Sequence, residues 1–326
     1  MSRFWRHIKK KSQLNLVKQP GCSATAGADV DAGTDASFFK IAFFMHPLFS
    51  HSRIGTFETC PRKFSFAYVE KLPAVGQSVE TFMGKRVHES LERLHQEAKA
   101  GHVLPEAELL ADFESRWRAE WTTAVRVVRR DKTEEDYRAA GSTCLARYHR
   151  RYTPFHHSVV ATEQRIEIAL DEGGQFRLQG FIDRIDQVAN GMLEVHDYKT
   201  SSRLPTQADC DADRQLAVYE MGVRALFPNT QEVKLVWHYL QFDREIRSRR
   251  TAGQLEELRA SLLAKAKAIV AATERGDFPT RVSRLCDWCD YRVHCPAFRQ
   301  TTGEKDAVQS SFIRTNLPRA LEKTTH

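Results

Sequence analysis

The amino-acid sequence predicts a mixed α/β fold, because strand-like and helix-like patterns alternate along its 326 residues. Two turn signals, Gly173-Gly174 and Asn190-Gly191, separate three segments of alternating apolar and polar residues. Such a series is typical of a meander of antiparallel strands. Apolar residues at helical spacing before and after the meander predict helices that pack on the sheet. The expected order is helix, three strands, helix, strand and helix.

The segment before the sheet is expected to be mainly helical. Ser52 can cap a short helix, and Pro61 is suited to the first turn of the next one. Helical patterns continue from 80 to about 151, with apolar residues at helical spacing at Val87, Leu91 and Leu94. We therefore expect this part of the chain to form a helical insertion before the sheet.

The strands and the later helices are predicted by residue composition as well as by the spacing of apolar residues. The three strands of the meander are expected at 165–170, 176–188 and 193–200. A helix at 208–226 is expected to end before Pro228, and a fourth strand, rich in valine and aromatic residues, is expected at 233–242. A long helix is expected from 253 to about 275, ahead of a cysteine-rich segment.

Domain boundaries are predicted from changes in composition. Residues 1–44 begin with basic residues and continue with a stretch that has no hydrophobic period, so we expect a poorly ordered extension. One domain is expected over 45–300, with 301–326 as a C-terminal tail. Within that domain we expect a helical part at 80–155, a core at 159–275 and a cysteine-rich tail at 286–295.

Composition and charge bound the class of protein. Lysine and arginine number 49 and aspartate and glutamate 42, which gives a net charge of +7 and a pI of about 9.0. A mildly basic protein is compatible with a nucleic-acid partner. No apolar run approaches the ~18 residues of a membrane span, so we expect no membrane association. Seven cysteines, an odd number, do not suggest a disulfide framework, and we expect a reducing, cytoplasmic setting.

A carboxylate–lysine group is predicted on the second and third strands. Side chains alternate along a strand, so Asp197 and Lys199 share one face of the third strand. Asp183 lies across the Asn190-Gly191 turn, and a tight antiparallel pair can bring it opposite Asp197. Two adjacent carboxylates repel each other unless a cation lies between them, and oxygen ligands suit Mg²⁺ or Mn²⁺. Such a site with a nearby lysine suits phosphodiester hydrolysis, whereas the alternative is an ordinary surface ion pair.

The motifs around this group resemble those of a known family. The run Gly-Phe-Ile-Asp-Arg-Ile-Asp at 180–186, followed by Asp-Tyr-Lys-Thr at 197–200, is similar to the PD-(D/E)XK nuclease superfamily in its RecB-like exonuclease branch. The resemblance implies a restriction-endonuclease-like core with the order of elements given above. It also implies that Asp183 and Asp197 bind the metal ion and that Lys199 is the catalytic lysine.

Other residues match positions of the same family. His88, in Gly84-x-x-x-His88, would by pattern alone be a core histidine, but the resemblance implies a metal ligand. Gln215 and Tyr219 are one helical turn apart and share a face, and the resemblance implies that they help to hold substrate. The alternative for this pair is a buried tyrosine beside a surface glutamine. Glu163 matches a frequent acidic position, and its role is left open.

Four cysteines form a second group. Cys286, Cys289 and Cys295 lie close together near the end of the domain, and Cys60 lies alone near its start. This spacing predicts a metal site, and the residues alone leave a zinc ion and an iron–sulfur cluster open. The distribution resembles that of the iron–sulfur RecB-like nucleases, which include CRISPR-associated members and the AddB subunit. That resemblance implies a [4Fe–4S] cluster, with Cys22, Cys144 and Cys210 incidental.

The function predicted from these features is that of a Mg²⁺- or Mn²⁺-dependent DNA exonuclease in DNA repair or recombination. Single-stranded DNA ends are the expected partner. The sequence has no Gly-x₄-Gly-Lys-Ser/Thr loop, so a helicase motor or an integrase would be supplied by another protein. One alternative is a processing nuclease of CRISPR spacer acquisition. Another, of a different class, is a non-catalytic DNA-binding subunit of a helicase–nuclease complex.

Overall fold

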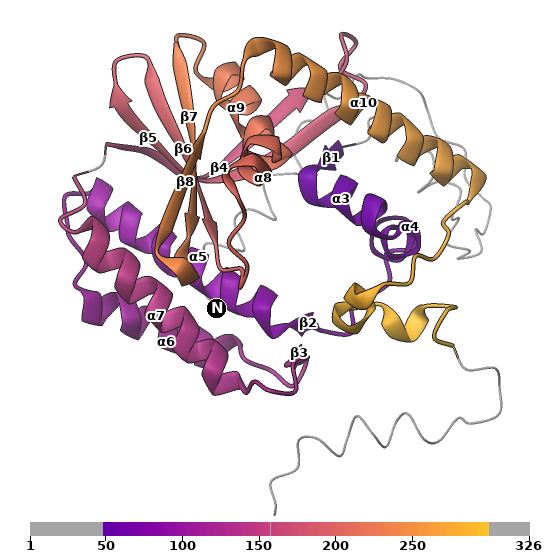
Figure 1. Cartoon of the computed structure of the whole chain (residues 1–326), viewed down its shortest axis with the longest axis horizontal. Coiled ribbons are helices and arrows are strands. Elements are labelled where there is room, and N and C mark those ends of the chain that lie inside the picture. The colour runs from indigo at the N-terminus through magenta and orange to yellow at the C-terminus, as the bar shows by residue number, and fades with distance from the viewer. Residues whose placement is uncertain (1–47, 157, 300–326) are drawn as a thin grey trace, which may run out of the picture. The chain divides into compact units, whose positions relative to one another are not determined.

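A six-stranded sheet forms the centre of the fold (Figure 1). The computed structural model describes residues 48–156 and 158–299, so the predicted extension 1–44 and tail 301–326 lie outside the described residues. The strands are β1 (Leu48–Ser50), β4 (Val159–Ala169), β5 (Arg177–Ala189), β6 (Met192–Lys199), β7 (Glu232–Tyr239) and β8 (Arg244–Ser248). They lie in the order β1-β5-β6-β7-β8, and β4 also pairs with β5. The predicted mixed α/β fold with a three-strand meander is confirmed.

The long strand β5 is shared by three neighbours. Strand β4 pairs with it along one edge, in antiparallel register from 177 to 186. On the other edge, β1 pairs in parallel with 177–179, and β6 pairs in antiparallel register with 184–189. Residues 180–183 therefore lie between two partner strands on that edge, where the described ladders leave a gap.

Helices cover both faces of the sheet (Figure 1). One core is formed by the sheet with α3 (His51–Thr59), α4 (Pro61–Phe64), α9 (Arg214–Leu226) and α10 (Ala252–Arg275). The other core joins the sheet to α5 (Val79–Lys99), α6 (Glu106–Glu120) and α7 (Glu134–Tyr152). Shorter elements are a π-helical turn (Ser65–Val69), β2 (Gln77–Ser78), β3 (Val125–Arg126), α8 (Gln207–Ala212) and 3₁₀ turns at Leu240–Phe242, Arg284–Trp288 and Arg292–His294. No helix in the described part of the chain has the length and apolar character to cross a membrane.

Several expected elements have different ends. The helix expected at 208–226 is two helices, because Asp213 is extended and accepts a hydrogen bond from the Gln215 amide as the N-cap of α9. The strand expected at 233–242 ends at Tyr239, where a 3₁₀ turn begins. The first helix is capped by Ser50 and not by Ser52. Strands β1 and β8 were not expected from the sequence.

Strand β5 changes its buried face at Asp183. Ile182 and Ile185 belong to the same hydrophobic core although they are three residues apart, whereas regular alternation would put them on opposite faces. In the β4–β5 register, Glu163 is the residue opposite Asp183, and its φ of 47° lies in the left-handed region. A glutamate in that conformation within a strand is strained, and such strain is concentrated at functional sites.

Helix α9 packs unusually close to the sheet at two glycines. A Cβ atom on Gly180 would lie 2.8 Å from Cε1 of Tyr219, and one on Gly222 would lie 2.5 Å from the Ile166 side chain. Both distances are too short for any larger residue without rearrangement. The two glycines therefore fix the approach of α9, and with it the position of Tyr219 over the strand that carries Asp183.

Candidate active site

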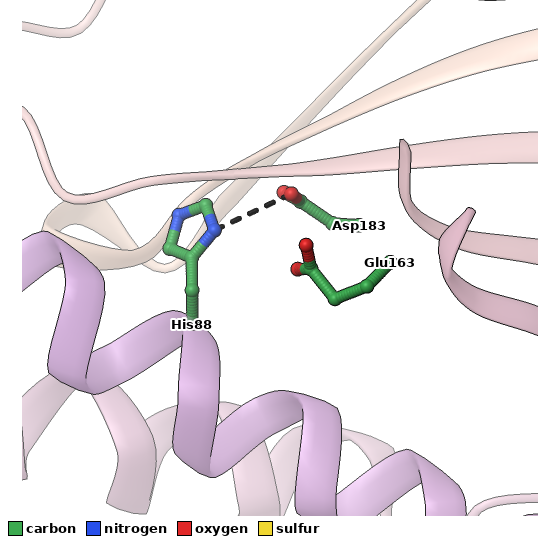
Figure 2. A group of neighbouring side chains, drawn as sticks. All are labelled: His88, Glu163 and Asp183. Carbon is green, nitrogen blue, oxygen red and sulfur yellow. Dashed lines mark ion pairs between the residues drawn. The ribbon is translucent and has the colours of Figure 1, made fainter. Parts of the chain in front are cut away.

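Three side chains from separate elements converge beside the gap in the sheet. Figure 2 shows His88 on α5 pointing toward Asp183 on β5, with the Glu163 carboxylate of β4 alongside. One potential ligand atom from each of these residues lies within 4.8 Å of the others. His88 Nδ1 lies 3.3 Å from Asp183 Oδ1. A nitrogen and two carboxylates at this spacing can hold a divalent cation.

The backbone of Tyr198 completes this group. Its N–H donates a hydrogen bond to Asp183 Oδ2 over 2.7 Å, and its carbonyl oxygen lies 2.8 Å from His88 Nε2. Burial lowers the pKa of His88, but the nearby Asp183 carboxylate outweighs it and raises the pKa to about 9. A protonated ring donates from both nitrogens, which matches its two contacts, and a neutral ring would keep the Nε2 contact and leave Nδ1 free to bind a cation.

A second group of hydrogen bonds lies on the neighbouring strand and helix. Lys199 Nζ is 2.7 Å from Asp197 Oδ2 and donates to Gln215 Oε1 over 2.8 Å. Gln215 Nε2 donates in turn to Asp197 Oδ1 and to the Tyr219 hydroxyl, both over 2.9 Å. The Asp213 cap starts α9 so that Gln215 reaches these partners. The β5–β6 register pairs Arg184 with His196, which makes Asp183 and Asp197 the next pair along it.

Burial and the charge of Asp183 shift the pKa values of the carboxylates in this region. Burial, reinforced by the charge of Asp183, raises the pKa of Asp197 to about 6, although Lys199 opposes the shift. Loss of hydration and the charge of Asp183 raise the pKa of Glu163 to about 7. For Asp183 itself, burial raises the pKa, but His88 and the Tyr198 amide outweigh it, so the pKa is lowered. The charge of Asp183 thus raises the pKa of both Glu163 and Asp197, and a bound cation would relieve this repulsion.

The four predicted cysteines meet in another part of the fold. Cys60, Cys286, Cys289 and Cys295 all line one cavity of about 380 Å³, although Cys60 is far from the other three in sequence. Two further cysteines lie elsewhere, since Cys144 is buried in the helical core and Cys210 in the core of the sheet. Cys22 lies outside the described residues.

Helix α3 extends between these two regions. It begins at His51, which burial and the positive charges of Arg214 and Lys199 give a lowered pKa. It ends at Thr59, so that Cys60 follows directly as its C-cap. Glu58 near the end of α3 accepts two hydrogen bonds from Arg214, which anchors the helix to α9.

A buried ionic network between β5, β6 and the helix α7 was not expected from the sequence. Arg184 donates to the hydroxyls of Tyr148 and Tyr198 over 2.6 and 2.9 Å, and its Nε lies 3.1 Å from Asp186. Asp186 Oδ2 lies 3.2 Å from His196 Nε2. The presence of Arg184 and Asp186 in one strand motif was a possible signal, but their partners come from distant elements. The network holds the ring of Tyr198, whose backbone contacts Asp183 and His88.

Comparison with known proteins identifies the family. The profile of the PD-(D/E)XK nuclease superfamily matches residues 48–296. A crystal structure of a candidate exonuclease from Eubacterium rectale is similar, with 12% identity, 89% of this chain and 100% of that chain covered, and a TM-score of 0.43. The protein designated SSO0001 gives 15% identity, coverage of 80% and 94%, and a TM-score of 0.35. No curated protein matches the sequence. Because the family match spans most of the chain and every described strand of the central sheet, the chain belongs to the PD-(D/E)XK nuclease superfamily.

Proposed function

We propose that the chain is a metal-dependent DNA exonuclease of the RecB-like branch that acts in DNA repair. The observation that carries the proposal is the convergence of His88, Glu163 and Asp183 next to the Asp197–Lys199 pair. Acidic side chains from three neighbouring strands, a histidine from a helix and a lysine form the set that phosphodiester hydrolysis requires. A non-catalytic DNA-binding subunit would have no need of this set.

The residues fit Mg²⁺ or Mn²⁺ on two grounds. Ligand atoms of three side chains lie within 4.8 Å of one another, and Asp197 adds a buried carboxylate on the neighbouring strand. We propose His88, Asp183 and Asp197 as ligands, with Glu163 and the Tyr198 carbonyl beside them. A bound ion would polarise the phosphoryl oxygen and lower the pKa of a water molecule.

The remaining residues have roles that follow from their contacts. Lys199 is held against Asp197 by Gln215, so its ammonium is oriented toward the carboxylates, where it can neutralise charge that develops on the phosphate. Gln215 and Tyr219 lie on one face of α9 and form the wall of the site on that side. We propose that this wall positions the DNA strand. A helicase or integrase partner would act in trans.

The direct test is incubation of the purified protein with end-labelled single-stranded and double-stranded DNA. We expect cleavage to require Mn²⁺ or Mg²⁺, because two of the three proposed ligands are carboxylates. Labelled mononucleotides or short oligonucleotides should be released from the ends. EDTA should abolish cleavage. DNA binding without cleavage under every metal condition would contradict the proposal and favour the non-catalytic DNA-binding subunit.

We propose further that Cys60, Cys286, Cys289 and Cys295 hold a [4Fe–4S] cluster. Thiolates at this sequence spacing also suit a zinc ion, which is the alternative occupant. The cavity of about 380 Å³ between the thiols and its lining by Arg62, Lys63 and Arg281 suit a larger, anionic group.

Replacement of Cys60 by alanine tests the cluster. We expect anaerobically purified wild-type protein to be brown and to contain iron and acid-labile sulfide, and the variant to be bleached. Stability should fall by about 2–4 kcal/mol, because the link between distant segments is lost. Cys144→Ala is the matched control and should keep its colour and iron. A Cys60→Ala protein with full colour, iron content and melting temperature would overturn the ligand set.

A further inference from the structure

One large aromatic side chain is exposed on the sheet beside the acidic group. Phe181 on β5 is 50% exposed, whereas its neighbour Ile182 is fully buried. Among the exposed large apolar residues in the described part of the chain, only Phe181 and Phe242 are aromatic. A phenylalanine in the middle of a long strand is usually covered by a packed element. Its exposure leaves an aromatic face open to solvent two residues from Asp183.

The direction of Phe181 follows from the alternation of β5. Ile182 packs into the core that contains α9, so Phe181 faces the opposite side of the sheet, the side from which His88 of α5 reaches Asp183. The rise of a strand puts alternate residues about 7 Å apart along it. Phe181 therefore lies two residues from Asp183 along the strand, on the face of the sheet from which His88 approaches.

The neighbouring strand adds positive charge to the same face. Arg165 on β4 is the register partner of Phe181, and Glu163, which faces Asp183, is two residues away from it. Glu167 lies 2.9 Å from both Arg165 and Arg177, so two guanidinium groups share one carboxylate. This exposed triad has one net positive charge, which would attract the phosphates of a DNA strand.

We propose that Phe181 and Arg165 form a platform on which an unpaired DNA base stacks next to the scissile phosphate. The inference rests on the proposed nuclease function and gives its substrate class as single-stranded DNA. Aromatic rings stack on bases of any sequence, and a nearby arginine adds a phosphate or cation–π contact. In a duplex the base faces are covered by their neighbours, so the platform favours frayed or single-stranded ends.

The test uses single-stranded oligonucleotides with one 2-aminopurine at successive positions from the end, in EDTA so that no DNA is cut. Stacking quenches 2-aminopurine fluorescence, so we expect wild-type protein to quench it at one position above all others. Phe181→Ala should abolish that quenching and weaken binding about 5- to 100-fold. Phe181→Trp should retain both properties and Phe181→Leu neither. Val188→Ala, an exposed apolar residue on the same strand, should behave as wild type.

The possible failures are distinguishable. The stacking proposal would be wrong if Phe181→Ala left quenching and affinity unchanged, or if Phe181→Leu kept both in full. The proposed nuclease function would not be affected by either result. Wild-type protein that neither binds nor cuts DNA would overturn both. An oligonucleotide that lacks the base at the quenched position gives a second test. It should bind wild-type protein more weakly than the intact oligonucleotide does, whereas Phe181→Ala should bind both equally. Melting temperatures of the variants should stay close to wild type because the side chain is half exposed.

Discussion

Asp183→Asn protein is expected to cleave DNA more slowly than wild type by on the order of 10³-fold or more, while remaining folded. The amide keeps an oxygen that can accept the Tyr198 N–H, so local structure is preserved. The negative charge that faces His88 and Glu163 is lost, and with it the ability to hold a divalent cation. Single-turnover rates on end-labelled DNA and Mn²⁺ binding by calorimetry provide the measurement.

Two other variants complete this experiment. Lys199→Ala should lose turnover and still bind Mn²⁺, because the lysine contacts Asp197 without being a proposed ligand. Glu257→Gln is the control, because it removes an exposed carboxylate of α10 that is not part of the proposed site. It should leave the cleavage rate unchanged. Normal cleavage by Asp183→Asn would show that the metal is held elsewhere.

Arg184→Met is expected to lower the free energy of unfolding by about 3–5 kcal/mol. Arg184 is 1% exposed, and its guanidinium lies against Asp186 and donates to the hydroxyls of Tyr148 and Tyr198. Methionine fills similar space but leaves the Asp186 charge in the core without this cation. Urea denaturation followed by circular dichroism measures the change.

The matched control for this substitution is Arg177→Met on the same strand. Arg177 is 52% exposed and pairs with Glu167 at the surface, where an ion pair contributes only about 0–1 kcal/mol. Its denaturation curve should nearly coincide with that of wild type. Equal stability losses for both variants would mean that the buried network contributes no more than a surface pair.

The sequence predicts best those contacts of the site that join residues close together along the chain. Asp183 and Asp197 flank one tight turn, so strand alternation and register bring them together almost independently of the rest of the fold. Gln215 and Tyr219 are one turn apart on a helix, and they do share a face. His88 required the family resemblance, because nothing local distinguishes it from a core histidine.

The remainder depends on contacts between distant elements or on backbone atoms. The Tyr198 carbonyl and amide carry no side-chain signal, although they touch His88 and Asp183. The left-handed conformation of Glu163 is imposed by its neighbours, since nothing in a glutamate side chain favours it. Strand β1 has three residues, too few for a periodic pattern, yet it closes one end of the gap in the sheet.

Helix α3 joins the cysteine cavity to the region around Lys199. Its nine residues form a stiff rod about 13 Å long, with Cys60 at one end and His51, close to Lys199, at the other. The same helix therefore fixes the positions of both Cys60 and His51, so a shift of Cys60 along the helix axis would also move His51.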